Sequence, residues 1–182
     1  FRVGVGRKEN LQDVERILKG MMARKYSESV LQMFNEKPGT IVLVRNTSAQ
    51  TIFLYSENQT LTGNDYPPGD NLIKISAVAD PDHRDKSLLT ITPEIRSTKT
   101  KPQIIRKRGT PRIQENPVLF LFRSMRFQLK MTDGEFMVIG PGIESHRPTS
   151  IGHHFLTNTK NNIEYEQFLV LHPQVVRFEL KN

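Results

Sequence analysis

The 182-residue chain carries 26 Lys and Arg against 19 Asp and Glu, a formal net charge of +7. The sequence contains no Cys, which excludes disulfide scaffolds, thiolate metal sites and cysteine nucleophiles. Its longest apolar runs are four or five residues, too short for a transmembrane segment. The length predicts a single domain over residues 1–182. The start at Phe1, without a basic region followed by an apolar one, indicates a fragment or a processed product without a signal peptide.

Residues 1–38 are predicted to form an N-terminal helical element. Apolar side chains recur every three or four residues from Leu11 to Met21, as on one face of a helix, and Asn10 is a suitable N-cap. A second short helix is predicted from Ser27. The glycines of Val3–Gly6 match no phosphate-binding motif and indicate a turn instead.

From residue 39 the sequence changes to strand character. Thr40–Arg45 and Gln50–Tyr55, separated by a polar turn, predict a β-hairpin. Residues 57–71 are rich in Asn, Asp, Gly and Pro and predict a long loop. Two more strands are predicted at Leu72–Val78 and Ser87–Thr92.

The remaining strands are short and separated by turn residues. The clearest hairpin joins Arg126–Met131 to Glu135–Ile139 through Asp133-Gly134, a dipeptide that favours tight turns. Residues 143–162 are polar and predict irregular structure. Further strands are predicted at Gln103–Arg106, Val118–Arg123, Tyr165–Leu171 and Gln174–Leu180.

Together these segments predict a mainly β protein. Nine or ten short strands without strand–helix–strand repeats favour an antiparallel β-sandwich or barrel over residues 39–182, with the N-terminal helical element packed against it.

The excess positive charge lies in one segment, residues 95–113. This basic segment has no acidic residue, and its basic residues are Arg96, Lys99, Lys101, Arg106, Lys107, Arg108 and Arg112. Subtracting these seven from the total leaves 19 basic against 19 acidic residues. The sequence therefore predicts an electrically balanced body that carries one cationic segment.

Such a segment is typical of contact with a polyanion. Each Lys or Arg at a phosphate releases condensed counterions, so the segment predicts binding to the backbone of DNA or RNA. It contains no aromatic residue that could stack on a base. Base recognition would need residues outside it, such as Phe53, Tyr55, Phe120 or Phe122, which are equally consistent with core positions.

Three other interpretations of the basic segment remain open. It fits an acidic protein surface or nuclear import signal, an anionic membrane surface, and a solvated loop. Thr92 and Thr110 each precede a Pro and are candidate phosphorylation sites, although a simple turn explains the same dipeptides.

Enzymatic chemistry has weak support in the sequence. His146, His153 and His154, with Glu144, have the composition of a metal site, but the spacing matches no metal-binding motif. Ser145 and His146 are neighbours and lack a nucleophile-elbow sequence. We therefore expect no catalytic residue, no metal and no cofactor, with a histidine-based hydrolase or metal enzyme as the weakest alternative.

The sequence predicts a non-enzymatic binding module, in which residues 95–113 engage nucleic acid within a larger intracellular, nuclear assembly. The alternative is a structural or scaffolding β-sandwich that binds other protein subunits, including a capsid-like role. The sequence leaves open the choice between DNA and RNA, the oligomeric state, the partners and the parent protein.

Overall fold

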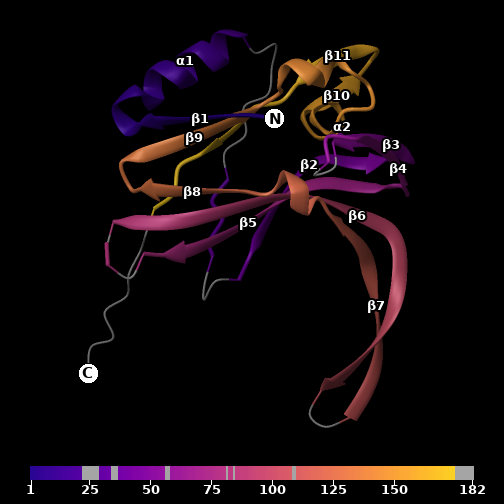
Figure 1. Cartoon of the computed structure of the whole chain (residues 1–182). Coiled ribbons are helices and arrows are strands. Elements are labelled where there is room, and N and C mark those ends of the chain that lie inside the picture. The colour runs from indigo at the N-terminus through magenta and orange to yellow at the C-terminus, as the bar shows by residue number, and fades with distance from the viewer. Residues whose placement is uncertain are drawn as a thin grey trace, which may run out of the picture.

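A computed structural model describes residues 1–21, 29–33, 37–55, 58–80, 82–83, 85–107 and 110–174, without the side chains of Lys107 and Lys160. The protein is mostly antiparallel β-sheet with an N-terminal helix, as predicted (Figure 1). The strands are β1 Arg2–Arg7, β2 Gly39–Thr47, β3 Gln50–Tyr55, β4 Leu61–Tyr66, β5 Gly69–Ala79, β6 Lys86–Lys107, β7 Thr110–Leu121, β8 Phe127–Thr132, β9 Glu135–Gly140, β10 Thr157–Lys160, β11 Ile163–Glu166 and β12 Leu169–Leu171. The α-helices are α1 Leu11–Met21 and α2 Ile151–Leu156, and 3-10 turns occupy Lys8–Asn10, Arg123–Met125 and Ile143–His146.

Two sheets form the layers of the body. The first has the order β1-β9-β12, and the second has the order β2-β5-β6-β7 with β8 also paired to β6. Two small hairpins, β3–β4 and β10–β11, complete the pairing. In the described part of the chain the strands do not close into a barrel, so the arrangement is sandwich-like.

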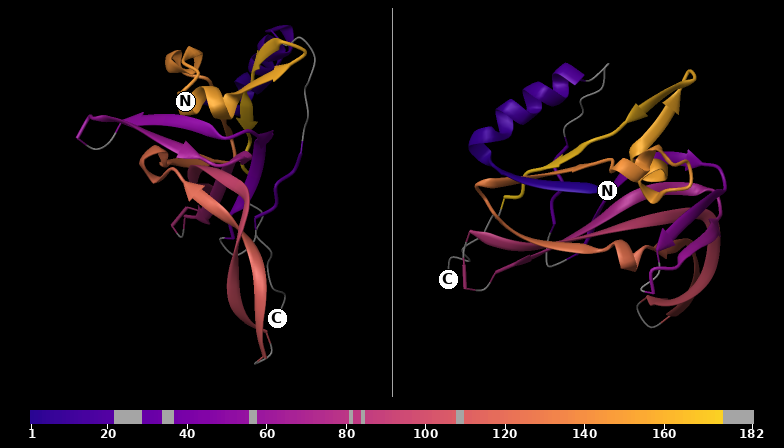
Figure 2. Two further views of the ribbon diagram at one scale, coloured as in Figure 1. Left: turned by 90° about the vertical axis from the view of Figure 1, so that its right-hand side faces the viewer. Right: turned by 45° about the horizontal axis from the view of Figure 1, so that its top comes forward.

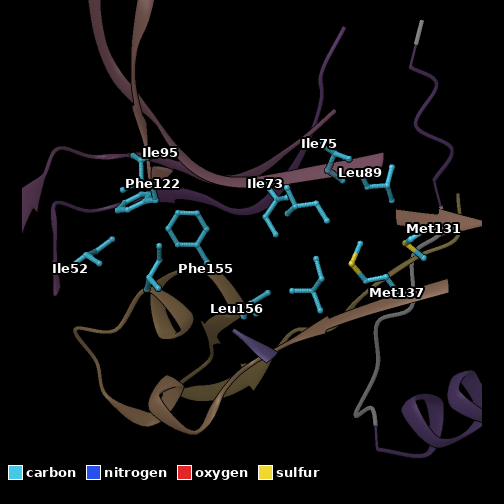
Figure 3. Close-up of a cluster of buried hydrophobic side chains, with 13 residues drawn as sticks. Ile52, Ile73, Ile75, Leu89, Ile95, Phe122, Met131, Met137, Phe155 and Leu156 are labelled. Carbon is cyan, nitrogen blue, oxygen red and sulfur yellow. The ribbon is translucent and has the colours of Figure 1, made fainter. Parts of the chain in front are cut away.

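The hydrophobic core lies between these layers (Figure 3). The second sheet contributes inward-facing Ile and Leu side chains of β5 and β6, including Ile73 and Leu89. The opposite side is formed by Met137 of β9 and by Phe155 and Leu156 of α2, all fully buried. Alternation along each strand supplies these residues, because successive side chains point to opposite faces.

The short helix α2 closes one end of the core. Ser150 caps it, its hydroxyl accepting a hydrogen bond from the backbone N–H of His153 at 3.1 Å. Phe155 packs edge-on against Phe122, with ring centroids 5.6 Å apart. The buried amide of Asn71 in β5 donates to the His154 carbonyl at 2.7 Å, which joins α2 to the second sheet.

The N-terminal residues differ from the prediction. The helix at Leu11–Met21 is confirmed, but Val3–Gly6, expected as a turn, lie inside strand β1. Arg2 pairs with Gly140 and Arg7 with Glu135, so tertiary pairing with β9 makes a glycine-rich segment a strand. Of the second predicted helix, the structure describes residues 29–33, which are not helical, and the rest of that prediction lies outside the described residues.

The first predicted hairpin is wrong in its pairing. Both segments are strands, but β2 pairs with β5 and β3 pairs with β4. The predicted loop over residues 57–71 supplies β4 and the start of β5. The polar composition predicted a loop, but polar residues also occur in exposed strands. Composition alone therefore cannot separate the two.

The Asp133-Gly134 turn is present, but its flanking strands do not form a hairpin ladder. β8 pairs with β6 in the second sheet, whereas β9 pairs with β1 and β12 in the first. The turn therefore carries the chain from one layer to the other. The flanking strands could pair with each other or join different sheets. The local sequence cannot distinguish these two alternatives, because each requires a strand with alternating apolar residues on both sides of the turn.

The last third of the chain is more regular than predicted. Residues 143–162 hold a 3-10 turn, α2 and strand β10 instead of irregular structure. The strand predicted at Tyr165–Leu171 is divided between the end of β11 and the whole of β12. The strand predicted at Gln174–Leu180 falls outside the described residues apart from Gln174. The helices in the described part of the chain all fall short of the length and apolar content that crossing a bilayer requires.

Candidate nucleic-acid interface

Most of the described part of the basic segment lies on a β-ribbon that projects from the body. The short strand predicted at Gln103–Arg106 is part of the 22-residue strand β6, which pairs with β7 along its outer half. We call the paired residues Thr100–Lys107 and Thr110–Pro117 the arm. Figure 1 and the left view of Figure 2 show the arm extending away from the two layers.

A β-bulge marks the root of the arm. Between the pairs Arg96–Leu119 and Thr100–Pro117, three residues of β6 lie opposite the single residue Val118 of β7. Within the bulge, the backbone N–H of Thr98 donates to the Pro68 carbonyl at 3.0 Å. A β-bulge bends the strand that contains it, so this bulge turns the outer half of β6 away from the second sheet.

The turn between β4 and β5 supports the root. A Cβ on Gly69 would lie 2.4 Å from the Arg96 carbonyl oxygen, so the backbones approach too closely for a side chain. Arg96 also donates to the Asp70 carboxylate at 2.8 Å, and the backbone N–H of Asn46 donates to the same group at 3.0 Å. The hydrogen bond from Arg96, followed by that from Asn46, lowers the pKa of Asp70.

Cross-strand register divides the arm into two faces. Residues opposite one another share a face, and successive residues alternate. Lys101 pairs with Asn116, Gln103 with Gln114 and Ile105 with Arg112, and these pairs form what we call the polar face. Pro102 pairs with Glu115, Ile104 with Ile113 and Arg106 with Pro111, and these pairs form the apolar face.

The polar face holds an ordered amide network between two cations. Gln114 donates to Asn116 at 3.0 Å, and Asn116 donates to Gln103 at 2.6 Å. Lys101 and Arg112 are exposed on either side of these amides. A shallow hollow of about 450 Å³ at the root end of the arm is lined by residues of both faces, namely Lys101, Gln103, Asn116 and Val118 with Pro102, Pro117 and Leu119. These amides were not predicted as contact residues, although they alternate with other residue types along both strands of the sequence.

The predicted site residues are not equivalent in the structure. Arg96 belongs to the root and forms an ion pair with Asp70, and Lys99 is exposed in the bulge. Within the described part of the chain, Lys99, Lys101, Arg106 and Arg112 form no ion pair with a carboxylate of the protein. The side chain of Lys107 and the whole of Arg108 lie outside the description.

The aromatic residues considered for base stacking lie outside the arm. Phe122 is buried against Phe155, and Phe120 packs edge-on against Tyr66 with centroids 5.4 Å apart. Phe53 and Tyr55 are exposed, but on the separate β3–β4 hairpin. The arm itself therefore carries no stacking platform in its described residues.

The two candidate phosphorylation sites differ in access. Thr92 is 4% exposed in the middle of β6, opposite Lys74. Thr110 is exposed at the first residue of β7, near the end of the arm. Phosphorylation of the folded protein, which stays a prediction, is therefore favoured at Thr110.

The histidines are held by backbone groups. A ring nitrogen of His153 lies 3.1 Å from the Ser145 carbonyl oxygen, and one of His154 lies 3.1 Å from that of Thr51. Burial lowers the pKa of His154, and neighbouring His153 contributes to the same shift. Among the described residues, no group of three His, Asp or Glu side chains is arranged to hold a metal ion.

A second hollow lies on the first sheet, away from the arm. It has a volume of about 510 Å³ and is lined mainly by backbone and apolar groups of β1, β9 and residues 141–143, with Arg2, His146 and Glu166 at its polar positions. None of its lining residues belongs to the basic segment.

A scan against protein-family models, a search of curated proteins and a search of solved structures each returned no match.

Proposed function

We propose that the protein is a binding module of a larger nuclear assembly, and that the polar face of the arm contacts the phosphate backbone of nucleic acid. The observation that carries the proposal is the position of Lys101 and Arg112 on one face of a projecting ribbon, exposed and without an internal carboxylate partner in the described residues. Over residues 100–117 there are five basic residues and one acidic residue, Glu115. This local charge density favours capture of a polyanion.

The shape of the arm favours duplex DNA over duplex RNA. The major groove of B-form DNA admits a two-stranded β-ribbon, whereas the major groove of A-form RNA is too deep and narrow for side chains to read. Gln103, Gln114 and Asn116 lie between the cations, and such amides can hydrogen-bond to base edges or phosphate oxygens. We expect binding that is dominated by electrostatics and sensitive to salt.

A gel-shift salt series tests this proposal. The double variant Lys101→Glu and Arg112→Glu should bind a mixed-sequence DNA duplex at least about tenfold more weakly than the wild type in moderate salt. Because two phosphate contacts are removed, the slope of log affinity against log salt should fall by about 2.

The matched control places the same charge change on the body. Lys8→Glu with Arg123→Glu alters the net charge equally, at two exposed positions outside the arm. The control should keep most of the wild-type affinity. Equal loss in both variants would show that overall charge alone attracts DNA, and unchanged binding in the arm variant would overturn the proposal.

A further inference from the structure

The apolar face of the arm continues onto the outer surface of β7. Every second residue of this strand from Pro111 to Leu121 is exposed, and all but one of them are apolar: Pro111, Ile113, Glu115, Pro117, Leu119 and Leu121. Ile113 is 74% exposed, and its partner across the ribbon, Ile104, is 73% exposed. At about 3.3 Å per residue, the row is roughly 33 Å long.

The solvent-exposed face of an antiparallel strand is ordinarily polar, whereas this exposed row of β7 is mostly apolar. An isolated two-stranded ribbon is marginally stable in water, and contiguous exposed apolar surface marks an interaction site more often than a free surface. In this arm, the three amides, Lys101 and Arg112 lie on one face, whereas Ile104 and Ile113 lie at the centre of the other. Nothing in the described part of the chain covers the central Ile104–Ile113 pair, which indicates a partner at this face.

We propose that the partner is a second copy of this chain, and that two arms pack with their apolar faces together and their strands running in opposite directions. The two-fold axis would pass between the Ile104–Ile113 pairs of the two copies. Such an interface is self-complementary, because each copy presents the same surface to the other. The four isoleucines would form its centre.

The charges on the apolar face favour this register. Arg106 lies two residues from Ile104 toward the tip of the arm, and Glu115 lies two residues from Ile113 toward the root. The two-fold operation places Arg106 of each copy level with Glu115 of the other, giving two intermolecular ion pairs. If the arms ran in the same direction, Arg106 would be level with Arg106, and the like charges would repel.

The inference does not rest on nucleic-acid binding. Face-to-face packing uses Ile104, Arg106, Ile113 and Glu115, whereas the proposed phosphate contacts use the opposite face. Both polar faces would remain outward in the dimer, so the two proposals can fail separately.

Single-cysteine cross-linking tests the contact, because the chain contains no natural Cys. Ile104→Cys places a thiol at the proposed two-fold axis, whereas Gln103→Cys places one on the opposite face of the same strand. A short bifunctional maleimide should convert the Ile104→Cys protein into covalent dimer at least about tenfold more efficiently than the Gln103→Cys protein. Equal cross-linking at both positions, or none at Ile104→Cys, would overturn the proposal.

A charge exchange tests the register by sedimentation velocity over a range of protein concentrations. Arg106→Glu alone and Glu115→Arg alone should each weaken dimer formation, and the combined variant should restore it because the ion pairs form with reversed sign. Arg106 and Glu115 are both exposed, so circular dichroism and thermal midpoints of the variants should match the wild type. Additive weakening in the combined variant would overturn the antiparallel register, and a monomer at all concentrations for the wild type would overturn the dimer.

Discussion

At the scale of single residues, Asp70 connects the arm to the body. Its carboxylate accepts hydrogen bonds from the Arg96 side chain in the arm root and from the Asn46 backbone in β2. Its side chain is 20% exposed, so water screens these bonds only in part. Arg96 was predicted from sequence among the nucleic-acid contacts, and its ion pair gives it a structural role at the root.

The pKa of Asp70 makes this connection dependent on pH. Because its hydrogen bonds hold the pKa of folded Asp70 below the ordinary value of 3.8, the ionised carboxylate stabilises the fold above that pH. The stabilisation is lost as the pH falls from 3.8 through the lower folded pKa. Asp70→Asn should lower the free energy of unfolding by about 1 kcal/mol at neutral pH.

Urea denaturation of the wild type and Asp70→Asn at several pH values measures this effect. The difference between the two proteins should shrink as the pH falls below 3.8. A difference that stays constant down to the most acidic conditions would show that the variant acts through packing and not through the charge.

At the scale of elements, α2 shows how a short segment can fix the core. Six residues form the helix, and four of them, Ile151, Gly152, Phe155 and Leu156, are buried. Phe155 contacts the rings of Phe1 and Phe122, with centroids 6.2 Å and 5.6 Å away. Local sequence did not reveal the helix because its stability comes from tertiary burial, and six residues are too few for a helix that is stable alone.

Removing the central ring should therefore be costly. Phe155→Ala should lower the free energy of unfolding by about 4 kcal/mol, because a fully buried ring leaves a cavity. Urea denaturation at neutral pH gives the value. Phe168→Ala is the control, since this ring is 37% exposed and should cost much less. Equal losses would contradict the central position of Phe155.

At the scale of the whole molecule, the structure separates a packed body from a projecting arm. The core cluster contains buried residues of both layers and α2, and no residue of the arm belongs to it. Much of the excess positive charge lies on the arm and not on the body, because residues 100–117 carry five of the 26 basic residues and one of the 19 acidic residues. Body and arm should thus behave independently.

Deleting the arm tests this independence. Replacing residues 101–116 by Asn-Gly, which forms a tight hairpin turn, should leave the free energy of unfolding within about 1 kcal/mol of the wild type. Urea denaturation with a two-state fit gives the comparison. A much larger loss would show that the arm contributes to the stability of the body, and would contradict the division described above.

The sequence by itself determined the mainly antiparallel β architecture, the first helix, most strand positions and the concentration of positive charge in residues 95–113. These properties depend on local alternation, helical periodicity and composition, which a reader can follow along the chain. Tertiary structure decided that Val3–Gly6 form a strand, that Asp133-Gly134 joins two layers, and that the cations lie on an arm with a polar and an apolar face. Each of these depends on which strand pairs with which, and partner choice comes from contacts between residues distant in sequence, where local patterns carry no information.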